Sequence, residues 1–136
     1  MAASTVVDAG FVVALLSKKD RHHPWAIMQS SQNPLPWVTC DAVLSEAFHL
    51  LGSNGRTSLT ALLRRAAVVS SFNFADETRR VLDLMDKYSA VPMSLADACL
   101  VRMSETLVEV VLLTTDADFR IYRRHGRQVV PCVMPR

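Results

Sequence analysis

Separate segments of the sequence place carboxylates at or near the ends of apolar stretches. Asp8 follows TVV, Glu46 lies within DAVLSEAFHLL, and Asp97 lies near the start of SLADACLV. Asp116 and Asp118 follow VEVVLLTT. Ligands of an open parallel sheet bind at the carboxyl ends of its strands, so we expect these acids to converge at one edge. Clustered carboxylates repel one another, and their oxygens are ligands that suit Mg²⁺ or Mn²⁺.

Each acid also has a structural explanation. Aspartates that precede helices are preferred caps, and Ser94 with Asp97 nearly matches a capping box. Glu46 is harder to explain in this way, because apolar neighbours cover most of the helix around it and predict that its side chain is at least partly buried. An ion pair with an arginine is the alternative for Glu46. Taken together, caps do not explain Glu46 or the doubled aspartate, whereas a metal site explains all the acids.

The elements expected to position these acids alternate along the chain. Apolar runs typical of buried strands occur at 4–8, 37–40, 70–74, 108–113 and 127–133. Between them, helical spacing predicts helices over 10–19, 21–30, 41–51, about 57–69, 75–88, 94–107 and 118–126. Apolar strands that alternate with helices predict an α/β fold, with a parallel sheet covered by helices on both faces.

Composition agrees with one domain that spans residues 1–136. Half of the residues are hydrophobic, yet the apolar runs are too short to cross a bilayer. The N-terminal segment lacks the early positive charge of a signal peptide, so we expect a cytoplasmic protein without membrane contact. The three cysteines have no CxxC spacing, which favours buried free thiols over a disulfide framework or a zinc site.

Basic residues cluster near the C-terminus, although the formal net charge is only +2. Arg120, Arg123, Arg124, His125 and Arg127 fall within eight residues. Such a cluster can hold phosphates, and the alternative is a solvated helix face. We take Arg120, Arg123 and Arg124 as the candidates for such phosphate contacts.

The acid-bearing segments together resemble a known family. In order along the chain, VVDAGFVVALL, DRHHPWA, VLSEAFHLL, PMSLADACLVRMSE and LLTTDADFRIYRRHG are similar to the motifs of PIN-domain nucleases, and among these to the VapC-type toxins of bacterial toxin–antitoxin pairs. The resemblance covers nearly the whole chain. It implies a three-layer α/β/α sandwich with a central parallel sheet of four to five strands.

The resemblance also implies roles for individual residues. Asp8, Glu46, Asp97 and Asp116 would bind one or two Mg²⁺ or Mn²⁺ ions and support RNA cleavage, with Glu46 either a ligand or the holder of a metal-bound water. Asp118 would have a lesser role. Two further positions of the motifs are notable: Thr114 matches a polar position that orients a carboxylate or a water, and Ser94 stands where many relatives carry another acid.

The implied partners are RNA, an antitoxin protein whose tail occupies the groove near the acids, and a second copy of the chain. Two alternatives remain open, and a third, an aspartate-dependent phosphatase, is disfavoured by the residue at position 10. A PIN-domain nuclease of RNA processing would lie outside toxin pairs, and an α/β binding module would use the acids only as caps and ion pairs. Phosphatases similar to haloacid dehalogenases need a second aspartate two residues after the first, where this chain has Gly10.

Overall fold

A parallel sheet of five strands forms the centre of the computed structural model, which describes residues 3–136. The order across the sheet is β3-β2-β1-β4-β7, and every neighbouring pair is parallel. The strands are β1 (Ser4–Val7), β2 (Trp37–Thr39), β3 (Val68–Ser70), β4 (Val110–Leu113) and β7 (Cys132–Val133). The predicted parallel sheet is thus confirmed.

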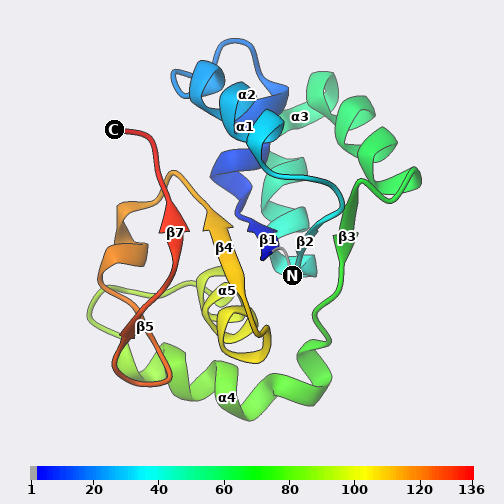
Figure 1. The fold of residues 1–136 in the computed structure, drawn as a ribbon. Helices are drawn as coiled ribbons and strands as arrows, with labels where there is room; N and C mark the ends of the chain where they lie inside the picture. Colours follow the sequence, from blue (N-terminus) through cyan, green and yellow to red (C-terminus); the bar gives the residue numbers. More distant parts are fainter. Residues whose placement is uncertain (1–2) are drawn as a thin grey trace.

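Helices cover the sheet in two groups (Figure 1). The chain runs outward from β1 to β3 through the first three helices and returns to β4 through the last two. Because crossovers between parallel strands are right-handed, the outward and return groups lie on opposite faces, which gives the predicted α/β/α sandwich. The helices are α1 (Ala9–Leu16), α2 (His23–Gln32), α3 (Asp41–Arg64), α4 (Phe74–Lys87) and α5 (Leu95–Thr106).

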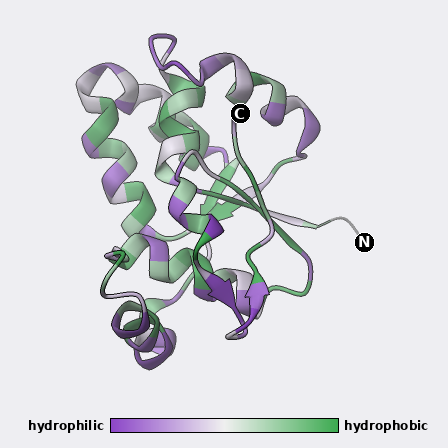
Figure 2. Cartoon of the chain, turned by 90° about the vertical axis from the view of Figure 1, so that its left-hand side faces the viewer, coloured by the Kyte–Doolittle hydropathy of each residue, from purple (hydrophilic) through white to green (hydrophobic). Residues whose placement is uncertain are grey.

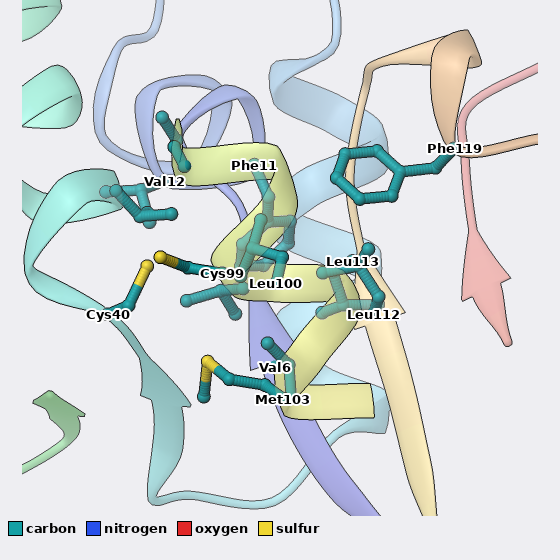
Figure 3. Close-up of a cluster of buried hydrophobic side chains, with 14 of the residues drawn as sticks. Val6, Phe11, Val12, Cys40, Cys99, Leu100, Met103, Leu112, Leu113 and Phe119 are labelled. Atoms are coloured by element: carbon teal, nitrogen blue, oxygen red, sulfur yellow. The ribbon is translucent and has the colours of Figure 1, made fainter. Parts of the chain in front are cut away.

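The core lies between the sheet and these helices. Figure 2 shows hydrophobic residues along the central strands and polar residues toward the outer surfaces. Val6 and Leu112 of the two central strands are fully buried, as are Phe11 of α1 and Leu100 of α5, and Figure 3 shows these side chains together. Burial of each side chain of this kind contributes about 1.5–3 kcal/mol, so the sheet forms a rigid base for the residues at the ends of its strands.

Helix α3 differs from the sequence prediction. The GSNG segment was expected to end one helix before another began near residue 57, but the helix resumes directly after a kink at Gly52 (φ 64°, ψ −161°). Gly55 fits this second segment because a Cβ there would lie 2.7 Å from the Leu51 side chain. The helix then ends at Arg64, and the following strand is Val68–Ser70 instead of the predicted 70–74.

The predicted last helix over 118–126 is wrong. A single 3₁₀ turn, η1 (Ala117–Arg120), is followed by a hairpin of β5 (Arg123–Arg124) and β6 (Gln128–Val129). The hairpin turn contains His125 and Gly126, both with positive φ (52° and 81°), which a helix cannot contain. None of the described helices is long and apolar enough to span a membrane.

Candidate active site

The predicted acids line one open cavity of about 700 Å³. Neighbouring strands explain the places of Asp8 and Asp116: Val7 of β1 pairs with Leu113 of β4, so Asp8 follows one strand end directly and Asp116 follows the adjacent strand end by three residues. Helices α3 and α5 supply the other walls. The acids that line the cavity are Asp8, Glu46, Asp97, Asp116 and Asp118.

Asp8 is the most buried of these acids, with 6% of its surface exposed. One carboxylate oxygen accepts a hydrogen bond from the Ala9 amide (2.7 Å), which caps α1. The other accepts from the Thr114 hydroxyl (2.7 Å), and Thr114 Oγ1 in turn accepts from the Asp116 amide (3.0 Å). The carboxylate is therefore fixed by both neighbouring strands, and the cap explains only one of its two contacts.

Burial dominates the electrostatics of Asp8. It raises the pKa of this carboxyl from 3.8 to about 7, although the hydrogen bonds from Thr114 and Ala9 lower it. The negative charges of Asp97 and Glu46 raise the pKa further. Among the described residues, the ion pairs join Arg102 to Glu77 and Glu105, so no arginine or lysine neutralises the cavity. A bound cation would relieve this repulsion.

Asp97 is held at the start of α5. Its amide donates to the Ser94 hydroxyl (3.0 Å), so Ser94 caps the helix as the sequence indicated. Its carboxylate accepts a hydrogen bond from the hydroxyl of Tyr122 (2.9 Å), a fully buried residue packed edge-on against Tyr88 and Phe119. Burial raises the pKa of Asp97, the Tyr122 hydrogen bond lowers it, and the charge of Asp116 raises it.

Sequence reasoning missed Tyr122, because it lay within the segment predicted to be a helix. The only available signal was the aromatic pair Phe119 and Tyr122 next to the acids. Two other residues of the cavity were also missed, Ser45 and Thr115. A Cβ at Gly10 would lie 2.0 Å from Thr115 Oγ1, so only glycine lets the first turn of α1 approach the loop after β4.

Glu46 corrects a prediction. The side chain was expected to be at least partly buried, but Glu46 is exposed, as is Ser45 beside it, whereas Val43 and Ala47 are fully buried. The apolar neighbours pack inward from the other side of α3, and Glu46 stands at the cavity where water reaches it. Asp116 caps η1 by accepting a hydrogen bond from the Asp118 amide (2.9 Å), and both side chains are half-buried.

The structure does not bring the three candidate arginines into the cavity. Arg120 is exposed on η1, and Arg123 and Arg124 are half-buried on β5. The Arg123 guanidinium donates to the backbone carbonyls of Arg120 (2.7 Å) and Tyr122 (3.0 Å), so it supports the local fold.

The side chains in the cavity suit a hard divalent cation, since their carboxylate and hydroxyl oxygens are its preferred ligands. Each Asp8 oxygen keeps a lone pair beyond the hydrogen bond that it accepts. Within residues 3–136, however, no three Asp, Glu, His or Cys side chains already form a group that could hold a metal ion. Mg²⁺ usually keeps several of its waters, so carboxylates that are not yet grouped can also hold it through these waters.

Comparisons with known proteins agree with this description. The profile of the PIN domain family matches residues 5–124. Among solved structures, the VapC20 toxin of Mycobacterium tuberculosis, described as cleaving the sarcin–ricin loop, superposes with a TM-score of 0.71 at 22% sequence identity. The match covers 85% of this chain and 92% of that toxin. No curated protein gives a significant match to the sequence.

The charge of Asp8 should destabilise the metal-free protein. Because its folded pKa is raised to about 7, the wild type loses stability as the pH rises from about 4 to 7, where the unfolded chain ionises first. Asp8→Asn removes the charge and keeps a good cap. In EDTA at pH 8 we expect this variant to be more stable than the wild type in urea unfolding, by at most about 4 kcal/mol.

The same comparison at pH 4 is the control, since this pH lies close to the unfolded pKa of 3.8 and the difference should nearly vanish. An Asp8→Asn protein that is less stable than the wild type at pH 8 would contradict the assignment of an uncompensated buried charge.

Proposed function

This chain belongs to the PIN domain family, and we propose that it is a divalent-metal-dependent endoribonuclease, the toxin of a VapBC-type toxin–antitoxin pair. The observation that carries the proposal is the convergence of Asp8, Glu46, Asp97 and Asp116 on one cavity. Members of this family are nucleases. The relative of similar fold is described as a toxin that cleaves an RNA loop, which supports RNA as the substrate.

We propose that Asp8, Asp97 and Asp116 hold Mg²⁺ or Mn²⁺. Glu46, which is exposed at the cavity, is a further ligand or holds a metal-bound water, and Asp118 has a supporting role. When bound, such a cation lowers the pKa of water and offsets the charge that develops on the phosphate during hydrolysis. A cation is also needed before RNA can approach, because the acids alone would repel its phosphates.

The other residues of the site position these carboxylates. Thr114 donates to Asp8 and accepts from the Asp116 amide, so one hydroxyl fixes the side chain of the first acid and the backbone of the second. Tyr122 donates a hydrogen bond to one oxygen of Asp97 and so fixes the orientation of this carboxylate. Fixed ligands matter because a displacement of about 1 Å can reduce a rate by about 10²-fold.

The remaining parts of the proposal concern partners. We propose that residues 1–136 form one nuclease domain, active in the cytoplasm as a homodimer and restrained by an antitoxin whose tail enters the acidic cavity. Arg120, Arg123 and Arg124 remain candidates to hold RNA outside the cavity, since each carries a positive charge and the net charge of the chain is +2.

Metal-dependent cleavage of RNA tests the proposed function. The purified chain should cleave members of a mixed set of single-stranded RNAs in Mg²⁺ or Mn²⁺ and should be inactive in EDTA. Asp97→Asn should reduce cleavage by about 10²-fold or more, as expected when a ligand for the transition-state charge is lost. The matched control is Glu109→Gln, which removes an exposed acid that precedes β4 and should have no effect.

Each failure of this experiment has a separate meaning. No cleavage together with no metal-induced rise in melting temperature would contradict the metal site and favour the binding module. Cleavage of RNA precursors without toxicity on expression in bacteria would contradict the toxin assignment and favour an RNA-processing nuclease.

The Tyr122 hydroxyl should strengthen metal binding through Asp97. Tyr122→Phe removes the hydrogen bond to Asp97 Oδ2 and keeps the aromatic ring in place. Because outer hydrogen bonds of this kind typically change metal affinity by 10–100-fold, we expect Mn²⁺ to bind about tenfold more weakly in calorimetry. The matched control is Tyr88→Phe, whose lost hydroxyl accepts from the Arg123 amide and does not contact an acid of the cavity. Equal Mn²⁺ affinities of Tyr122→Phe and wild type would contradict this role.

A further inference from the structure

Two cysteine side chains meet beside the acidic cavity. Cys40 lies immediately before α3 and is 1% exposed, and Cys99 lies in α5 and is 2% exposed. Figure 3 shows their sulfur atoms pointing toward one another, and each thiol affects the pKa of the other. Both are free thiols, as predicted, but no local pattern indicates that two segments 59 positions apart bring them together.

The thiols are not sealed in the core. Both line a second cavity of about 380 Å³, whose other walls include Phe72 and Phe74. This cavity is the side from which a small uncharged molecule would approach the sulfur atoms. Ala42, Ser45 and Leu95 line both this cavity and the acidic one, so the two cavities share a wall.

We propose that Cys40 and Cys99 form a redox-active dithiol site, in which a peroxide oxidises the two thiols to a disulfide that joins the start of α3 to α5. The sulfur of Cys40 attacks one oxygen of hydrogen peroxide, the O–O bond breaks, and the other oxygen leaves as water. The sulfur of Cys99 then attacks the resulting sulfenic acid and releases a second water. The thiols lose two protons and two electrons in total, and the peroxide accepts them.

The surroundings select this pair over the third cysteine. Cys40 and Cys99 point toward one another and line the same cavity, so the sulfenic acid of one has the thiol of the other beside it. Cys132 lies on β7, and β1 and β4 separate that strand from β2, which ends just before Cys40. Cys132 is therefore an internal control.

Oxidation should affect the acidic cavity, a consequence that rests on the proposed function. Cys99 follows Asp97 by two residues on α5, and Cys40 precedes the helix that carries Glu46. A bond between the sulfurs constrains these two walls, and small displacements of ligands are costly to catalysis. We expect RNA cleavage to fall about tenfold or more after oxidation and to return after reduction with dithiothreitol.

Peptide mapping of the full chain tests the disulfide. The reduced protein is treated with hydrogen peroxide, denatured in iodoacetamide and digested, and the peptides are weighed. We expect a linked pair of peptides that contain Cys40 and Cys99, with Cys132 alkylated. The proposal is overturned if both thiols are alkylated after peroxide treatment, if they become separate sulfinic acids, or if either is joined to Cys132.

A cleavage assay of the same samples tests the consequence. Cys99→Ser should remain active in peroxide, whereas Cys132→Ser should lose activity as the wild type does. A mapped disulfide without loss of cleavage would overturn the link to the acidic cavity. If the reduced wild type cleaves no RNA, the proposed nuclease function fails, while the mapping still decides whether the disulfide forms.

Discussion

The structure of the site depends on a carboxylate buried at the end of the sheet. Asp8 is held between β1 and β4 by the Ala9 amide and the Thr114 hydroxyl, and burial raises its pKa to about 7. Charge at such a place is unfavourable unless something compensates it, and the described residues provide hydrogen bonds but no ion pair. The buried ends of the two central strands therefore carry an uncompensated negative charge, and such a charge favours the binding of a cation.

Helix capping and metal binding turn out to be compatible uses of the same residues. Asp8 caps α1, Ser94 caps the helix of Asp97, and Asp116 caps η1. A cap fixes the side chain at a helix start, and the carboxyl ends of parallel strands are where those helices begin. The sequence presented capping as an alternative to a site, but in the structure the caps orient the acids that line the cavity.

Local patterns predicted the parts of the site that depend on strand ends. Asp8 and Asp116 follow apolar strands that pair directly, and Ser94 precedes an amphipathic helix. The few residues next to each of them in the sequence were therefore enough to predict its place. Local sequence patterns failed where a contact between distant segments determines the position of a side chain. The exposure of Glu46 depends on a cavity formed by other elements, and Tyr122 reaches Asp97 only because a positive-φ turn at His125 and Gly126 replaces the predicted helix by a hairpin.

The two cavities suggest how such a site can be sensitive to its surroundings. Acids at strand ends are fixed by the sheet, whereas Glu46 and Asp97 depend on how α3 and α5 pack. The Cys40 thiol, just before α3, meets the Cys99 thiol of α5. Both line a cavity that shares a wall with the acidic cavity. The strands cannot move without disrupting the core, so any adjustment of the site must come through the helices. The thiol pair lies where a chemical change can act on both α3 and α5.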